Sequence, residues 1–166
     1  MSTAEALLTP DIRRMEESDL DVVMEVERES FSTPWSRGTF RGLMRRSDAS
    51  LWVAEVSHCV VGYAVVWYLF QQAELGNLAV APGWRRRGLG KRLLDWALEK
   101  ARERGTERIF LEVRISNRAA QRLYERYGFV QVGLRRRYYR EPVEDARVMS
   151  LDLGQLFRGA SQGGAG

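Results

Sequence analysis

Hydrophobic positions along the chain follow two different spacings, which predicts a mixture of strands and helices. The segment 60–70 is almost continuously apolar, as expected for a central strand that is covered on both faces. The segment 88–104 instead repeats leucine and alanine at helical spacing and is followed by Gly105, a suitable left-handed C-cap. The alternation of such segments predicts an α/β fold (α+β in some schemes), with helices on both faces of a mixed sheet.

The remaining elements follow from the same patterns and from N-cap residues. Further strands, making about seven in all, are expected over 11–15, 51–56, 73–80, 107–114, 129–134 and 146–153. Helices are expected from Ser18 to Ser30, after the cap residue Ser36, and from Ser116 or Asn117 to Tyr127. Residues 1–10 and 158–166 show no periodicity, so we expect flexible ends around a single domain spanning 11–157.

Composition excludes several classes of protein. With 45% apolar and 10% aromatic residues in 166, the chain is expected to fold rather than remain disordered. One cysteine, Cys59, and one histidine, His58, exclude a disulfide framework and a structural zinc site, and we expect them at a hairpin with Cys59 buried. No apolar run reaches the roughly 18 residues of a membrane span. A cytoplasmic protein without a membrane partner is therefore expected.

The positive charges are concentrated in two places. There are 26 lysines and arginines against 22 acidic residues, and the triplets Arg85–Arg87 and Arg135–Arg137 stand beside unusual local sequence. With Tyr138 and Tyr139 nearby, these arginines favour one alternative, a basic domain that binds RNA.

A turn between an expected strand and an expected helix carries the clearest chemical signal. After Val80-Ala81-Pro82-Gly83-Trp84, three arginines lead into Gly88-Leu89-Gly90. Glycines let a ligand approach the backbone, and unpaired amides at a helix start favour an anion such as pyrophosphate. The spacing fits neither a Walker A loop nor a dinucleotide-binding turn. The pattern alone fits an ordinary basic helix start equally well.

This turn resembles the acetyl-CoA motif of the GNAT acetyltransferase superfamily, Arg/Gln-x-x-Gly-x-Gly/Ala, through Arg85, Gly88 and Gly90. The resemblance extends through Asn77-Leu78-Ala79-Val80-Ala81-Pro82 and through Leu111-Glu112-Val113-Arg114, Ser116-Asn117, Leu123-Tyr124 and Tyr127-Gly128-Phe129. It is similar in particular to the branch that acetylates ribosomal-protein alanine (RimI-type), from which Gly76 and Arg137 depart. The resemblance implies the GNAT fold, with a mixed, mostly antiparallel sheet of about seven strands and a splay after the fourth strand.

The resemblance also implies a set of binding residues. Acetyl-CoA would be held by Leu78, Ala79, Val80, Arg85, Arg86, Arg87, Gly88, Leu89, Gly90, Lys91, Asn117 and Tyr124. The peptide substrate would be held by Phe31, Trp35, Asn77, Tyr138 and Tyr139.

Two catalytic roles are implied in the same way. Glu112 would be the general base for the substrate ammonium, and Tyr124 would donate a proton to the departing thiolate. Without the resemblance, Glu112 fits a charge on a solvated face, Tyr124 fits a core tyrosine, and Asn117 fits a helix cap.

The sequence thus predicts an N-acetyltransferase that acts on a protein α-amino group, such as that of a ribosomal protein, by direct attack in a ternary complex. A GNAT enzyme that acetylates a small amine or a lysine side chain is the nearest alternative. Direct nucleic-acid binding is not expected, because an RNA surface gains nothing from Glu112.

Overall fold

The structure is a computed structural model that describes residues 9–154. It divides into two compact units, one of Met1–Trp67 with Gly76–Ala97 and the other of Tyr68–Leu75 with Leu98–Gly166. Segments 1–8 and 155–166 lie outside the described residues, so the expected flexible ends stay a prediction, as does the single catalytic domain.

Seven strands make up the sheet of the described residues, in the order β1-β2-β3-β4-β5-β7-β6. Their bounds are β1 (Asp11–Arg14), β2 (Ala49–Val56), β3 (Cys59–Leu69), β4 (Gln72–Val80), β5 (Arg108–Arg114), β6 (Val130–Arg140) and β7 (Val143–Asp152). The β4–β5 pair is parallel, whereas β1–β2, β2–β3, β5–β7 and β6–β7 are antiparallel. The predicted mixed sheet is confirmed.

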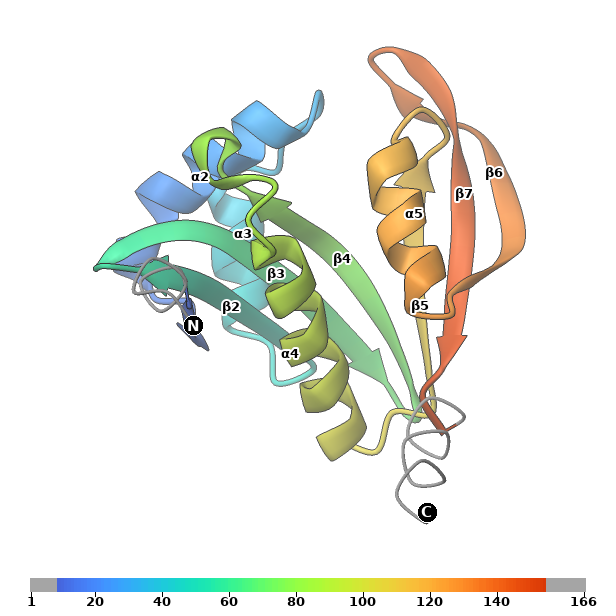
Figure 1. The fold of residues 1–166 in the computed structure, drawn as a ribbon, viewed down its shortest axis with the longest axis horizontal. Coiled ribbons are helices and arrows are strands. Elements are labelled where there is room, and N and C mark those ends of the chain that lie inside the picture. Colours follow the sequence, from blue (N-terminus) through green and yellow to red (C-terminus); the bar gives the residue numbers. More distant parts are fainter. Residues whose placement is uncertain (1–8, 155–166) are drawn as a thin grey trace. The chain divides into compact units, whose positions relative to one another are not determined.

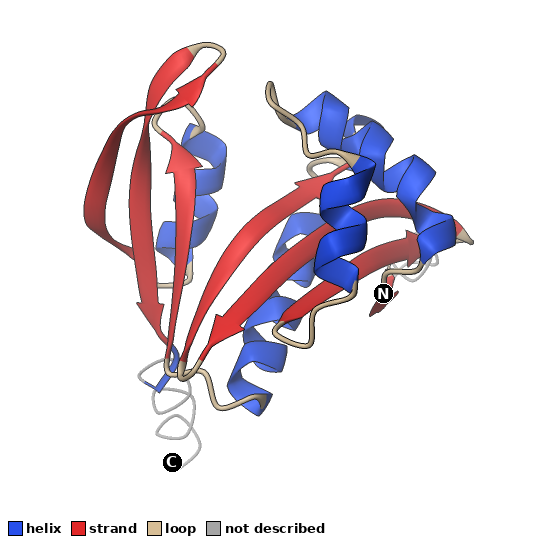
Figure 2. Ribbon diagram, turned by 180° about the vertical axis from the view of Figure 1, so that it is seen from behind, coloured by secondary structure: helices blue, strands red, loops and turns tan. Residues whose placement is uncertain are grey.

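The first unit has helices on both faces of its strands. A short 3-10 helix, η1 (Glu17–Asp19), leads into α2 (Leu20–Ser30), which packs with α3 (Arg37–Met44) on one face, while α4 (Leu89–Glu103) covers the other (Figures 1 and 2). Ser36 caps α3 as predicted. Ser18 does not cap α2: it lies inside η1, where the Asp19 carboxylate instead accepts a hydrogen bond from the backbone amide of Glu16.

Hairpin turns account for two differences from the sequence prediction. Ser57 and His58 adopt positive φ between β2 and β3, which turns the following Cys59 toward solvent, so its predicted burial is wrong. The segment after residue 134 was expected to connect two strands, but β6 and β7 continue almost to the turn at Glu141 and Pro142.

The second unit places α5 (Arg118–Arg126) along β5 and β7 (Figure 1). β4 pairs with β5 only from Gln72 to Leu75, which agrees with the expected splay after the fourth strand. Gly105 and Gly128 have positive φ where α4 and α5 end, as predicted for Gly105. None of the helices within residues 9–154 is long and apolar enough to cross a membrane.

Candidate functional site

The glycine-containing turn lies in the first unit, between β4 and α4. A second 3-10 helix, η2 (Pro82–Trp84), precedes it, and Arg86 and Gly88 then adopt positive φ. The amide of Arg92 donates to Gly88 O at 3.1 Å, so the amides before it lie at the open end of α4. A Cβ built on Gly90 meets only Leu78 and Val80, both at 4.0 Å. Packing within the chain therefore does not require glycine at 90.

Arginine side chains around this turn are engaged to different degrees. Arg85 donates from Nε to Val80 O at 2.9 Å and from its terminal nitrogen to Ser30 Oγ at 3.2 Å, which joins β4 to the end of α2. Arg87 lies over the Trp84 ring, 5.1 Å from its centroid. Arg85 therefore shapes the turn, whereas Arg86 and Arg87 present exposed charge.

Several predicted cofactor residues offer main-chain groups only. The side chains of Ala79, Val80 and Leu89 are buried in the core of the first unit. Leu78 is half-buried, and Lys91 is exposed on the first turn of α4.

Glu27 joins two of the predicted substrate residues, although the sequence analysis did not identify it. Its carboxylate accepts from Trp35 N at 2.9 Å, from Asn77 Nδ2 at 3.0 and 3.1 Å, and from the Tyr63 hydroxyl. Glu27 is only 1% exposed, and burial raises the pKa of its carboxyl above the usual range. The loop after α2 and the strand β4 are thereby fixed to each other.

Aromatic side chains surround the same part of the first unit. Trp35 lies 5.5 Å from Phe40 and 6.2 Å from Trp67, measured between ring centroids, and Phe31 packs against the same core. A Cβ on Gly76 would come within 2.3 Å of the Trp67 ring. Glycine at 76 is therefore required by the Trp67 side chain.

The predicted base lies in the second unit on β5. Glu112 has a side chain that is 13% exposed and forms an ion pair with Arg135, whose Nε lies 2.9 Å from Oε1. The Tyr138 hydroxyl also donates to Glu112, which raises the pKa of Tyr138 to about 12. The structure therefore brings Glu112 and Tyr138 together, and it adds Arg135, for which no separate role was predicted.

Tyr124 and Asn117 occupy α5 as expected from its pattern. Tyr124 is buried, its ring lies 5.6 Å from that of Phe129, and burial raises its pKa to about 12. Asn117 Oδ1 accepts from Ala120 N at 3.2 Å, so Asn117 is a helix cap in this structure. The cap uses only the amide oxygen of Asn117, and the side-chain NH₂ group takes no part in it.

Arg114 fixes the β6–β7 hairpin against β5. Its guanidinium pairs with Glu144 at 2.9 Å and lies 4.2 Å from the centre of the Tyr139 ring. Glu144 also accepts from the backbone amide of Ser116 at 2.9 Å, and hydrogen bonds from the Ser116 side chain and from Arg114 lower the pKa of the Glu144 carboxyl. The Tyr139 ring therefore packs against the Arg114 guanidinium and is half-buried, whereas Tyr138 is 47% exposed.

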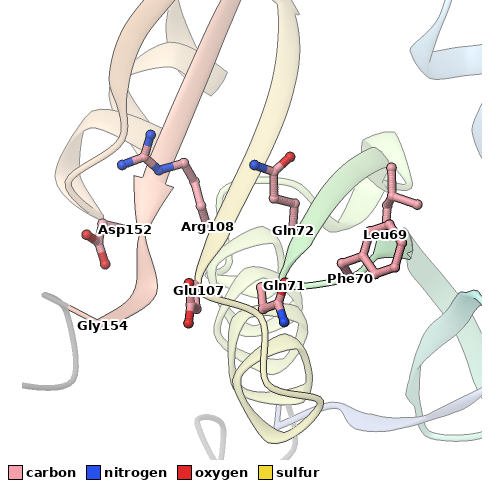
Figure 3. A pocket seen from close by; sticks show the side chains of 8 residues that line it. All are labelled: Leu69, Phe70, Gln71, Gln72, Glu107, Arg108, Asp152 and Gly154. Atoms are coloured by element: carbon pink, nitrogen blue, oxygen red, sulfur yellow. The ribbon is translucent and has the colours of Figure 1, made fainter.

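A pocket elsewhere in the second unit contains none of the predicted site residues (Figure 3). It lies near the β3–β4 turn, where β4 and β5 begin and β7 ends, and its lining includes the exposed side chain of Phe70. Its lining is Leu69, Phe70, Gln71, Gln72, Glu107, Arg108, Asp152 and Gly154.

Glu27 had a detectable sequence signal, whereas Arg135 had none. Glu27 stands four residues after Val23 and seven after Leu20, so a carboxylate falls on the apolar face of α2. Arg135 is one of several arginines in its segment, and only the hairpin shows which of them meets Glu112.

Comparisons with known proteins point to one family. The profile of the Acetyltransferase (GNAT) family matches residues 20–129. The ribosomal protein bS18-alanine N-acetyltransferase of Salmonella typhimurium is 35% identical over 138 residues, covering 82% of this chain and 93% of the relative.

Solved structures agree with that comparison. The Escherichia coli ribosomal-protein-S18-alanine N-acetyltransferase has a TM-score of 0.81 and 32% identity, covering 87% of this chain and 94% of its own. Ard1 from Thermoplasma volcanium has a TM-score of 0.82 and 30% identity, covering 87% of this chain and 97% of the Ard1 chain.

Proposed function

Because the chain belongs to the GNAT acetyltransferase family, we propose that it transfers the acetyl group of acetyl-CoA to the amino-terminal nitrogen of a protein. The first candidate substrate is the amino-terminal alanine of a ribosomal protein, the activity named for relatives with 32–35% identity that match more than four fifths of this chain. The observation that carries the proposal is Glu112, a mostly buried carboxylate on β5 that has no role in the apolar core.

The β4–α4 turn is assigned to the pyrophosphate of acetyl-CoA. Gly88 and Gly90 leave the backbone open, the first amides of α4 donate to phosphate oxygens, and Arg86 and Arg87 add positive charge. Main-chain groups of Leu78 to Val80 are assigned to the pantetheine arm and to the thioester oxygen. A preorganised donor of this kind typically contributes about 3 kcal/mol to the transition state.

Chemistry proceeds by direct attack, without a covalent enzyme intermediate. The substrate ammonium loses a proton to Glu112, directly or through water, and the free amine attacks the thioester carbon. The C–N bond forms, the C–S bond breaks and CoA leaves as a thiolate. As the tetrahedral intermediate collapses, its nitrogen releases a second proton to solvent, which leaves a neutral amide. An α-amino group has a pKa near 8, so about a tenth is already neutral at pH 7 and the base needs little strength.

Tyr124 is assigned to the departing thiolate as a neutral phenol. Its pKa of about 12 keeps it protonated throughout the physiological range. Because a thiol has a pKa of about 8.5, full transfer from such a phenol to thiolate is uphill, and Tyr124 acts mainly by donating a hydrogen bond.

The test presents acetyl-CoA with peptides that carry a free amino-terminal alanine, with amino-terminally blocked lysine peptides, and with small amines. Mass spectrometry then locates the acetyl group. Acetylation confined to the α-amine supports the proposal. Acetylation of lysine or of small amines alone would replace it with the alternative GNAT activity.

A further inference from the structure

We propose that Glu27 is a positioning residue for the substrate's amino terminus, because it turns Asn77 Oδ1 outward to accept a hydrogen bond from the α-ammonium. The inference rests on the proposed function and adds a specificity element to it. All of the residues involved belong to the first unit.

The orientation of the Asn77 amide follows from its contacts. Both oxygens of Glu27 lie within hydrogen-bond distance of Asn77 Nδ2, at 3.0 and 3.1 Å. A carboxylate only accepts hydrogen bonds, so the amide must present its NH₂ group to Glu27 and its oxygen away from it. Within residues 9–154, Asn77 Oδ1 has no hydrogen-bond partner, and Asn77 is only half-buried. An outward amide oxygen suits an N–H donor.

Stability alone does not explain a carboxylate at this place. Among the described residues, Glu27 contacts neutral donors and forms no ion pair, although it is 1% exposed. Burying a charge with neutral partners is costly, and an apolar residue of similar size is often at least as stable. Glu27 also lies in the last turn of α2, where helix carbonyls already carry negative partial charge. The negative potential at this end of α2 therefore favours a cation beside Asn77.

Trp35 is fixed by the same carboxylate. Its backbone amide donates to Glu27 at 2.9 Å, and its ring packs against Phe40 and Trp67. Glu27 therefore sets the position of a half-buried aromatic wall together with that of the Asn77 amide. An amine with a short apolar side chain, such as an amino-terminal alanine, matches this combination.

The test uses steady-state kinetics with an amino-terminal peptide that the wild-type enzyme acetylates. Glu27→Gln and Asn77→Ala should each raise the peptide KM by about tenfold, as expected for the loss of one charge-assisted hydrogen bond, with smaller changes in kcat. CoA affinity should not change. Because Glu27 acts through Asn77, the double variant should be no worse than the more affected single variant.

Tyr63→Phe is the matched control. Tyr63 is fully buried and donates to Glu27 from the core, so its loss should lower the melting temperature and leave the peptide KM within about twofold. Additive effects of Glu27→Gln and Asn77→Ala would show that Glu27 does not act through Asn77. An unchanged peptide KM in either folded variant would overturn the inference. If Glu27→Gln does not fold, the peptide KM of Asn77→Ala decides the test.

Binding separates the inference from the proposed function. Calorimetry compares a peptide bearing a free α-ammonium with the same peptide in which propionyl replaces the amino-terminal alanine and the ammonium is absent. Wild type should prefer the free ammonium, and Glu27→Gln should lose this preference. If wild type acetylates only lysine or small amines, the proposed function fails. If it acetylates amino termini and Glu27→Gln keeps the preference, the inference alone fails.

Discussion

At the scale of single residues, the pairing of Glu112 with Arg135 bears directly on how a base can work. The Arg135 side chain is 59% exposed, although that of Glu112 is only 13% exposed, so the guanidinium remains in contact with water when it leaves the carboxylate. A substrate ammonium can therefore replace the guanidinium beside Glu112 at little cost. Until the substrate arrives, the ion pair holds the Glu112 carboxylate in one orientation.

The proposed roles of Glu112 as a base and of Tyr124 as a hydrogen-bond donor predict different pH behaviour for two variants. Glu112→Gln keeps the shape of the side chain and removes the base, so kcat should fall by about 10²-fold or more. Higher pH should partly restore activity, because bulk solvent then produces the free amine. Tyr124→Phe removes the donor to the thiolate and should gain no such benefit. Rate–pH profiles decide the point, and near wild-type turnover in both variants would disprove these roles.

At the scale of elements, the start of α4 carries the prediction for acetyl-CoA. Gly90→Glu places a carboxylate where the pyrophosphate is expected, so CoA affinity should fall at least tenfold, about 1.4 kcal/mol. Gly42→Glu is a matched control, because a Cβ at exposed Gly42 on α3 meets nothing within 4 Å. Calorimetry on both folded variants checks the result. Equal losses would indicate a general charge effect rather than a site at Gly90.

The β6–β7 hairpin allows its two tyrosines to be separated. Tyr138 is exposed and donates to Glu112, so Tyr138→Ala should raise the peptide KM and leave CoA binding nearly intact. Tyr139 lies against Arg114, so Tyr139→Ala should raise the peptide KM and also lower the melting temperature by loosening the hairpin. Kinetics and thermal unfolding of each variant test this. A matching loss of CoA affinity would contradict the assignment to the peptide.

Sequence patterns predicted the elements where local signals decide them. Ser36, Asn117 and Gly105 occupy the predicted cap positions, because capping depends on neighbours a few residues away. The length of the β6–β7 hairpin was missed because its arginines and tyrosines do not alternate with apolar residues. Its strands are set instead by pairing and by the register shift between Arg135 and Tyr139.

At the scale of the whole molecule, long-range contacts explain what the sequence could not reveal. Glu27 bonds to groups 8, 36 and 50 residues away, so its burial depends on three separate segments meeting. No periodicity within α2 could show which of these segments supplies the donors. The family resemblance predicted Trp35 and Asn77 but not the carboxylate that joins them.

The buried carboxylates of Asp19 and Glu27 should change the stability of the protein in opposite directions as pH rises. Asp19 is paired with Arg13 at 2.8 Å, which lowers the pKa of Asp19 below its usual 3.8. Its stabilising contribution is present above pH 3.8 and is lost as pH falls through the lower folded pKa. Burial raises the pKa of Glu27 above 4.5, so the folded state favours the protonated carboxyl. Stability linked to Glu27 is full below pH 4.5 and decreases as pH rises through the raised value.

Thermal unfolding of wild type, Glu27→Gln and Asp19→Asn across acidic to neutral pH measures these two effects in one experiment. Relative to wild type, Glu27→Gln should gain melting temperature as pH rises from 4.5, because glutamine carries no charge to bury. Asp19→Asn should be less stable than wild type at neutral pH, and the difference should shrink below pH 3.8 as wild-type Asp19 becomes protonated. The Tyr63 hydroxyl, which donates to Glu27, is present in all three proteins. It therefore does not change the sign of either variant's difference in melting temperature from wild type. If the difference in melting temperature between Glu27→Gln and wild type is the same at every pH in this range, Glu27 does not titrate there. The expected cost of burying its charge at neutral pH would then be wrong.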